Sequence, residues 1–218
     1  MNKTFIFTDV HGCGKELEKL VLPFVHDCDL YSLGDNFDRA FDGVKVYEIL
    51  RKYDVRCIMG NHEHKMLEYL EGRRSWLPKH YYYFLHEFTK KYKIQELVDF
   101  IKSMKLLIPL DDEYILTHAG INLDDPYKED LSANVYGRYE GKYDWVDHYN
   151  DIPTIVYGHV VHTDVLHHNR TIGLDTGACH GQKLIGMCID DGTHLFHHIN
   201  TENYYGEMKH LEIPQFNI

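Results

Sequence analysis

Residues 3–12 read KTFIFTDVHG, and this stretch sets the pattern from which the fold is predicted. Its first part is an apolar run of residues that favour β-strands, and the run ends at Asp9 and His11. A short segment with apolar residues on one helical face follows, and Pro23 ends it. We therefore expect a strand, a polar turn and a helix in this order.

The same plan occurs twice more along the chain. Residues 29–33 form a second apolar run that ends at Asp35, and a helical pattern covers residues 43–52. A third apolar run at residues 55–59 ends at Asn61. Strands that alternate with helices indicate βαβ units and a largely parallel sheet, so we predict an α/β fold.

Three polar side chains follow these strands at equal intervals. Asp35 lies 26 residues after Asp9, and Asn61 lies 26 residues after Asp35. Equal βα repeats bring such residues to one edge of a sheet, where ligands bind because loops and helix termini converge there. We expect the active site at the carboxyl ends of the strands.

The rest of the chain differs in pattern. Residues 62–105 form a helical insert with nine Lys or Arg against six Asp or Glu, and it is the only net-basic part. Residues 106–117 predict a β-hairpin, residues 154–157 a further strand, and residues 164–199 a set of short antiparallel strands. No linker or low-complexity segment separates these parts, so we predict a single domain over residues 1–218.

Composition argues against several classes of protein. A formal net charge of −11 and a pI near 5.8 argue against a general binder of nucleic acid or of anionic membranes. The first residues hold no apolar run of signal-peptide length, and no segment approaches the roughly 20 apolar residues of a membrane span. The five cysteines form no C-x-x-C pair and are expected to be reduced, so we expect a cytoplasmic protein.

Five predicted strand ends present side chains that can bind a metal ion. Asp9 and His11 are two residues apart, and in extended chain such side chains point the same way and can meet one ion. Mixed imidazole and carboxylate ligands suit Mn²⁺, Fe²⁺ or Zn²⁺, and a set this large suits two ions that share a carboxylate. The candidate ligands are Asp9, His11, Asp35, Asn61, His118 and His159.

The order of the motifs resembles a known superfamily. The motifs are Asp9-x-His11, Gly34-Asp35-x-x-Asp38-Arg39, Gly60-Asn61-His62-Glu63, His118-Ala119-Gly120 and Gly158-His159. Together they are similar to the calcineurin-like metallophosphoesterase superfamily. Within it the chain resembles the phosphoprotein phosphatase branch, notably the phage lambda-type serine/threonine protein phosphatases and the symmetrical diadenosine tetraphosphatases. The sequence LDTGA at residues 174–178 resembles that branch's D-T-G segment.

The resemblance implies a fold and a cofactor. The fold is a two-sheet mixed β-sandwich flanked by helices, and the cofactor is a pair of divalent metal ions, with Mn²⁺ expected and Fe²⁺ or Zn²⁺ as alternatives. The implied ligands of the first ion are Asp9, His11 and Asp35. The implied ligands of the second ion are Asp35, Asn61, His118 and His159, so Asp35 bridges the pair. Two such ions would activate water for in-line attack on a phosphate ester.

Four further residues take catalytic roles by the same resemblance. His62 would protonate the leaving oxygen, with Asp38 orienting the imidazole and raising its pKa. Arg39 would bind the phosphate in a bidentate manner. Arg138 resembles the family's second phosphate-binding arginine, although Tyr136 stands where the family usually has a tryptophan.

Two departures from the family pattern bear on the prediction. Ala40 replaces the glycine that usually follows the D-R pair. Val161 stands where many superfamily members have the second histidine of G-H-x-H, and this favours the phosphatase branch over the nuclease and cyclic-nucleotide branches.

The expected activity is hydrolysis of phosphomonoesters, with a serine/threonine protein phosphatase as the first expectation. The alternative is symmetrical hydrolysis of diadenosine tetraphosphate, for which the tyrosine-rich insert offers base-stacking side chains. A third reading is a metal-binding interaction module without catalysis, and the presence of His62, Asp38 and Arg39 argues against it. The expected partner is a phosphorylated protein or a small phosphoester, and the oligomeric state stays open.

Overall fold

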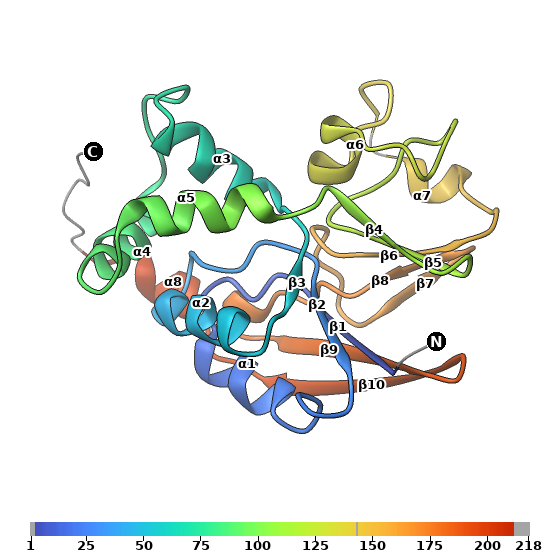
Figure 1. Cartoon of the computed structure of the whole chain (residues 1–218), viewed down its shortest axis with the longest axis horizontal. Helices are drawn as coiled ribbons and strands as arrows, with labels where there is room; N and C mark the ends of the chain where they lie inside the picture. The colour runs from blue at the N-terminus through green and yellow to red at the C-terminus, as the bar shows by residue number, and fades with distance from the viewer. Residues whose placement is uncertain (1–2, 143, 212–218) are drawn as a thin grey trace.

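Two mixed β-sheets with helices around them form the protein (Figure 1). The structure is a computed structural model, and it describes residues 3–142 and 144–211. The strands of the first sheet are β1 (Thr4–Phe7), β2 (Asp29–Ser32), β3 (Arg56–Cys57), β9 (Lys183–Asp190) and β10 (Thr193–Asn200). They lie in the order β10-β9-β1-β2-β3. Pairing is parallel from β1 to β2 to β3 and antiparallel from β1 to β9 to β10.

The second sheet is built from the later part of the chain. Its strands are β4 (Leu107–Leu110), β5 (Tyr114–Thr117), β6 (Thr154–Tyr157), β7 (Leu166–His168) and β8 (Thr171–Gly173). They lie in the order β4-β5-β6-β8-β7, and β5, β6 and β8 run parallel. The predicted two-sheet mixed sandwich is therefore confirmed.

The alternation of side chains along β1 shows how the layers pack. Phe5 and Phe7 lie in the apolar cluster on the helical side of the first sheet, whereas Ile6 lies in a second cluster. That second cluster also holds Leu116 of β5 and Val156 of β6, so it forms the core between the two sheets. Successive residues of a strand point to opposite faces, and β1 therefore anchors both layers.

The helices cover the outer faces and the site end of the sandwich (Figure 1). They are α1 (Gly14–Val21), α2 (Gly43–Lys52), α3 (Asn61–Leu70), α4 (Lys79–Thr89), α5 (Ile94–Ser103), α6 (Leu131–Tyr136), α7 (Trp145–His148) and α8 (Tyr204–Met208), with a 3-10 turn at Ala178–His180. The predicted helical insert is confirmed as α3, α4 and α5. None of the helices in the described ranges is long and apolar enough to cross a bilayer.

The tail differs from its prediction in one respect. The β7–β8 and β9–β10 pairs are antiparallel, as expected, but they belong to different sheets. Strand β8 also runs parallel to β6, so the tail completes both sheets instead of forming an antiparallel set of its own. The short helices α6, α7 and α8 were not predicted, because four to six residues give no readable periodicity.

Candidate metal centre

Residues that are far apart in the sequence converge at the carboxyl ends of the central strands. Donor atoms of Asp9, His11 and Asp35 lie within 4.8 Å of one another, and so do donor atoms of Asp35, His118 and His159. These side chains are buried, apart from the partly buried His159. Asp35 belongs to both groups, so the arrangement can hold two metal ions about a shared carboxylate.

The backbone of the site is held in the left-handed region, which non-glycine residues rarely adopt. The residues concerned are Asp9 (φ 49°), His11 (φ 47°), Asp35 (φ 55°), Arg39 (φ 76°) and His159 (φ 69°). Each such residue costs of order 1–3 kcal/mol and persists only where the surrounding structure enforces it. This backbone conformation accompanies the convergence of the side chains at the strand ends.

Two glycines leave room for the carboxylates. A Cβ on Gly60 would lie 2.2 Å from Oδ1 of Asp35, and a Cβ on Gly158 would lie 2.2 Å from Oδ2 of Asp9. Neither distance is possible for real atoms, so only glycine allows this approach. In the space beside Gly158, Thr8 donates a hydrogen bond of 2.6 Å to Asp9, and the backbone N–H of His159 donates another of 2.9 Å.

Hydrogen bonds to the outer ring nitrogens orient two candidate ligands. Nδ1 of His118 donates to the carbonyl oxygen of Leu33 at 2.9 Å, and this leaves Nε2 facing Asp35 at 3.5 Å. Nδ1 of His11 lies 3.4 Å from Asp38, and its Nε2 lies 3.6 Å from Asp35. Outer partners of this kind fix the tautomer and the ring orientation of metal-binding histidines.

The side-chain amide of Asn61 completes the second group. Its inner atom lies 3.2 Å from His118 Nε2, 3.2 Å from His159 Nδ1 and 3.0 Å from Asp35 Oδ2. When the amide oxygen faces inward, it and the three neighbouring atoms all present lone pairs to the same space. Such a group of lone pairs suits a cation. With the amide turned over, its NH₂ group faces the same three acceptors and can donate its two hydrogens among them. The set of donor atoms therefore fits a divalent ion. Without an ion, rotation of the Asn61 amide supplies hydrogen bonds to the same atoms.

The ionisation states also suit metal binding. Burial lowers the pKa of His11 to about 3 and that of His159 to about 4, with Arg39 and His118 respectively adding to the effect. Burial likewise lowers the pKa of His118. Burial alone would raise the pKa of Asp35, but the surrounding histidines outweigh it and hold this pKa below its usual range. Neutral imidazoles around an ionised carboxylate are the forms that bind metals.

His62 differs from the other histidines of the site. Its Nδ1 lies 2.6 Å from Oδ2 of Asp38, and its backbone N–H donates to Asp35 at 2.9 Å. Burial alone would lower the pKa of His62, but Asp35 and Asp38 outweigh it and raise this pKa. The site thus raises the pKa of one histidine and lowers that of three others, which is how neighbouring groups acquire different roles.

Arg39 spans the space between two imidazoles. Nη1 donates to Nε2 of His11 at 3.1 Å, and Nη2 donates to Nε2 of His62 at 3.0 Å. Its Nε is buried without a hydrogen-bond partner among the described residues, and its guanidinium lies 5.4 Å from the centre of the Tyr205 ring. The two Nη groups are therefore the donors that could turn from the imidazoles to an oxyanion.

Arg138 lies just past the carboxyl end of α6. It is exposed, and it follows Gly137, the left-handed residue that ends α6. Its charge acts on the half-buried Tyr136, whose hydroxyl lies 2.8 Å from Nδ1 of His64 in α3. The predicted phosphate contact of Arg138 remains a prediction.

Two residues near the site were not among the predicted site residues. Nε2 of His80, on α4 of the insert, lies 3.1 Å from Oδ2 of Asp38, so that carboxylate faces both His62 and His80. Glu63 accepts backbone hydrogen bonds from Asp35 at 2.8 Å and Gly60 at 3.0 Å. The last residue of the GNHE motif could have indicated Glu63, whereas nothing in the sequence marks His80.

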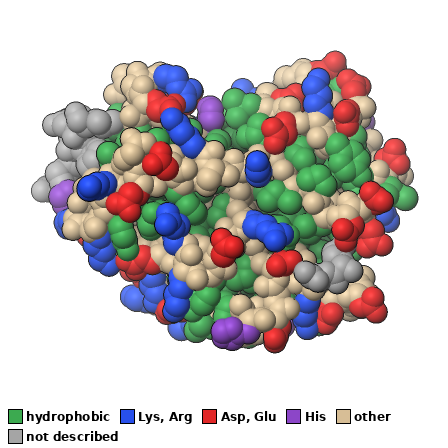
Figure 2. Space-filling view, viewed as in Figure 1, with side chains coloured by type: hydrophobic (Ala, Val, Ile, Leu, Met, Phe, Trp, Pro, Cys, Tyr) green, Lys and Arg blue, Asp and Glu red, His purple; other side chains and the backbone are tan. Residues whose placement is uncertain are grey.

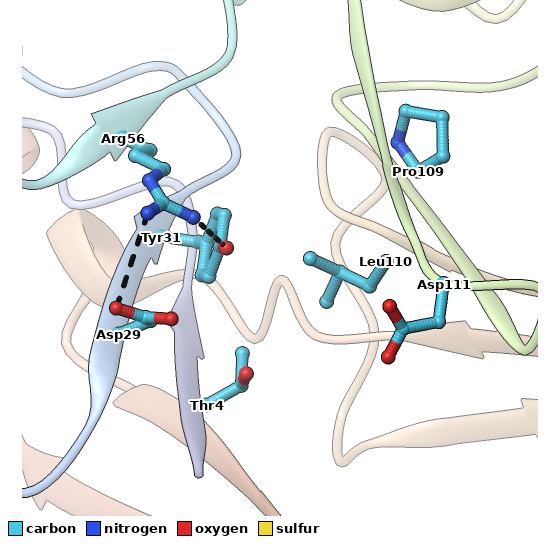
Figure 3. A pocket seen from close by; sticks show the side chains of 7 residues that line it. All are labelled: Thr4, Asp29, Tyr31, Arg56, Pro109, Leu110 and Asp111. Atoms are coloured by element: carbon cyan, nitrogen blue, oxygen red, sulfur yellow. Dashed lines mark hydrogen bonds and ion pairs between the residues drawn. The ribbon is translucent and has the colours of Figure 1, made fainter. Parts of the chain in front are cut away.

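A cleft of about 510 Å³ lies elsewhere, at the amino ends of β1 and β2 (Figure 3). Arg56 crosses its wall and donates to the Tyr31 hydroxyl at 2.5 Å. Asp29 lies 4.0 Å from the same guanidinium, so the most basic group of the cleft is already engaged by protein partners. The candidate metal ligands do not line this cleft.

Known proteins are similar to this chain in sequence and in architecture. An asymmetrical bis(5'-nucleosyl)-tetraphosphatase PrpE of Bacillus subtilis is 30% identical over 84% of this chain and 88% of its own length. The enzyme of the same name from Oceanobacillus iheyensis is 27% identical over 84% of this chain and 86% of its own length.

Among solved structures, one described as a candidate diadenosine tetraphosphatase matches 93% of this chain and 95% of its own, with a TM-score of 0.69 and 20% identity. A metallophosphoesterase from Sphaerobacter thermophilus matches 95% of this chain and 92% of its own, with a TM-score of 0.57 and 16% identity. These two likenesses show the fold. The model of the calcineurin-like phosphoesterase family matches residues 3–181, a range that includes every candidate ligand. The chain therefore belongs to the calcineurin-like phosphoesterase family.

Proposed function

We propose that this chain hydrolyses dinucleoside tetraphosphates asymmetrically, to a nucleoside triphosphate and a nucleoside monophosphate. The observation that carries the proposal is the similarity to enzymes of that name, which covers 84% of this chain and 86–88% of theirs. The likeness extends over nearly the whole of each chain, so it is not confined to a single motif. The buried cluster of metal-competent side chains adds independent support from geometry.

The proposal includes two divalent metal ions, of which Mn²⁺ is our first choice. We assign Asp9, His11 and Asp35 to one ion and the group around Asn61 to the other. When bound, such a pair lowers the pKa of a water molecule and neutralises charge on the phosphate oxygens. The remaining tasks belong to the side chains around the pair.

His62 is our candidate for the general acid. Its Nδ1 faces the carboxylate of Asp38 at 2.6 Å, so its Nε2 is the atom that would give a proton to the leaving oxygen. Nε2 now accepts from Arg39 at 3.0 Å. We propose that a substrate phosphate takes over the donors of Arg39, which frees Nε2 to hold its proton. Arg39 then orients the phosphate while His62 completes bond cleavage.

The first expectation from the sequence was a serine/threonine protein phosphatase. The broader expectation, a member of the calcineurin-like phosphoesterase family, is confirmed. For the substrate, the names of the relatives support the dinucleotide alternative better than the phosphoprotein. That alternative assumed symmetrical cleavage, whereas the relatives are named asymmetrical, and we follow the relatives.

The test is product analysis with Mn²⁺-loaded protein. Diadenosine tetraphosphate, p-nitrophenyl phosphate and phosphoserine, phosphothreonine and phosphotyrosine peptides are compared by kcat/KM, with products separated by ion-exchange chromatography. We expect the dinucleotide to be preferred and to yield ATP and AMP in equal amounts. Two molecules of ADP would indicate symmetrical cleavage, and a preference for phosphopeptides would restore the protein phosphatase. Absence of Mn²⁺-stimulated turnover with every substrate would favour the non-catalytic module.

A further inference from the structure

Lys65 places a positive charge beside the second group of candidate ligands. It lies on α3, four residues after Asn61, and its ammonium is 2.7 Å from the outer atom of the Asn61 amide. It is half-buried, and it lies 5.9 Å from the centre of the Tyr136 ring. Within the described part of the chain it forms no ion pair with a carboxylate.

The orientation of Asn61 decides whether Lys65 has a partner. If the amide oxygen faces outward, it accepts a hydrogen bond from Lys65 at 2.7 Å. If the oxygen faces inward, as a metal ligand must, the NH₂ group faces the ammonium, and two donors then oppose each other. A half-buried ammonium without an acceptor is costly. The ligand-binding form of Asn61 therefore leaves the Lys65 ammonium available to an anion that enters from solvent.

The surroundings of Lys65 keep it at the edge of the site. The hydrogen bond of 2.8 Å between His64 and Tyr136 joins α3 to α6, and the ring of Tyr136 lies under the Lys65 ammonium. In the space-filling view the surface is hollowed between the part of the molecule with α3 and the part with α6 (Figure 2). Lys65 on α3 and Tyr136 on α6 thus form a contact between these two parts of the molecule.

Arg39 provides a second positive charge on the other group of residues. Its guanidinium contacts His11 and His62, whereas Lys65 contacts Asn61. One phosphate can satisfy Arg39, but a single phosphate does not need two cations attached to different parts of the site. A chain of phosphates offers an acceptor to each.

We infer that Lys65, supported by the Tyr136–His64 pair, binds a phosphate group of the polyphosphate chain next to the one that is attacked. The inference rests on the proposed function and makes Lys65 a determinant of specificity for polyphosphate over phosphomonoester substrates. It uses the ammonium as a charge and hydrogen-bond donor only, and it requires no proton transfer at this residue.

The experiment compares Lys65→Met, which keeps the length of the side chain, with Lys65→Arg, which keeps the charge. We expect Lys65→Met to lower kcat/KM for diadenosine tetraphosphate by about 10- to 100-fold, the size of one lost hydrogen bond between charged groups. The loss with p-nitrophenyl phosphate is expected to be at least ten times smaller, while Lys65→Arg recovers most of the activity on the dinucleotide. Lys90→Met removes a lysine elsewhere on the insert and is expected to change neither value, since Lys90 is exposed and paired with Glu87.

A binding measurement separates this inference from the proposed function. Tripolyphosphate and orthophosphate are titrated by calorimetry into Mn²⁺-loaded protein, with the same free Mn²⁺ concentration in both solutions, because the inference concerns the form in which the Asn61 oxygen faces the metal site. We expect Lys65→Met to weaken tripolyphosphate binding at least fivefold more than orthophosphate binding, and Tyr136→Phe to give a smaller change in the same direction. Failure of the wild-type protein to prefer the dinucleotide overturns the proposed function only. Equal tripolyphosphate affinities of wild type and Lys65→Met, or an equal loss on both substrates, overturn the role of Lys65.

Discussion

The Asp38 carboxylate lies 2.6 Å from Nδ1 of His62, and this pair distinguishes His62 from the other histidines of the site. Replacement of His62 by Asn removes the proton donor and retains a polar side chain of similar size. We expect kcat to fall by about 100-fold or more, the usual contribution of a general acid. Elemental analysis should find unchanged metal content, and His86→Asn, an exposed residue on α4, should behave as wild type. Loss of both metals in the His62 variant would instead make this residue structural.

The raised pKa of His62 predicts the alkaline limb of the pH profile. Burial lowers the pKa of His62, but the carboxylates Asp35 and Asp38 raise it by more. The protonated form of His62 therefore persists to higher pH than that of a free imidazole. A general acid acts in this form. The value of kcat/KM should therefore fall as pH rises through the pKa of His62, and the limb should be absent in His62→Asn. An unchanged limb in the variant would assign it to another group.

Metal binding should stabilise the fold, because the two groups of ligands exist only in the folded chain. At a free Mn²⁺ concentration of 100 times Kd, one bound ion adds about 2.7 kcal/mol to the free energy of unfolding. Thermal unfolding with Mn²⁺ and with a chelator measures this difference. Asp35→Asn should abolish most of it, because Asp35 belongs to both groups. Asp112→Asn, an exposed control, should retain it, and retention in Asp35→Asn would contradict the shared carboxylate.

The close approach of Gly158 to Asp9 gives a prediction about packing. Gly158→Ala places a Cβ 2.2 Å from both Thr8 Oγ1 and Asp9 Oδ2, so their hydrogen bond must break. Metal affinity should fall by about 10- to 100-fold, as with other losses of groups that orient ligands. The control is Gly72→Ala, whose φ of 74° is unfavourable but whose Cβ meets no atom within 4 Å. It should lower stability by about 1–2 kcal/mol and leave metal affinity unchanged.

The sequence alone predicts the parts of the site that follow strands. Asp9, Asp35 and Asn61 recur at equal spacing after apolar runs, and parallel pairing of β1, β2 and β3 brings them to one edge. This works because a strand has a strong local pattern and its carboxyl end is fixed by the topology of the sheet. The role of each individual ligand stays a prediction.

Other features could not be predicted, because they depend on contacts between distant segments. His80 reaches Asp38 from a helix whose own sequence shows only an apolar face, and Lys65 meets Tyr136 across the packing of α3 on α6. The division of the tail between the two sheets is also a tertiary property. Each tail strand is a short run of residues compatible with a β-strand, and such a run does not say which sheet the strand joins.

The left-handed backbone at Asp9, His11, Asp35, Arg39 and His159 has a consequence for protein engineering. Glycine adopts this conformation without a steric cost, so glycine substitutions at these positions would relieve strain while removing the groups that act. A library selected for thermal tolerance in the absence of metal ions should therefore drift toward inactive variants at these positions. Selection for heat resistance in this protein has to be coupled to turnover from the first round.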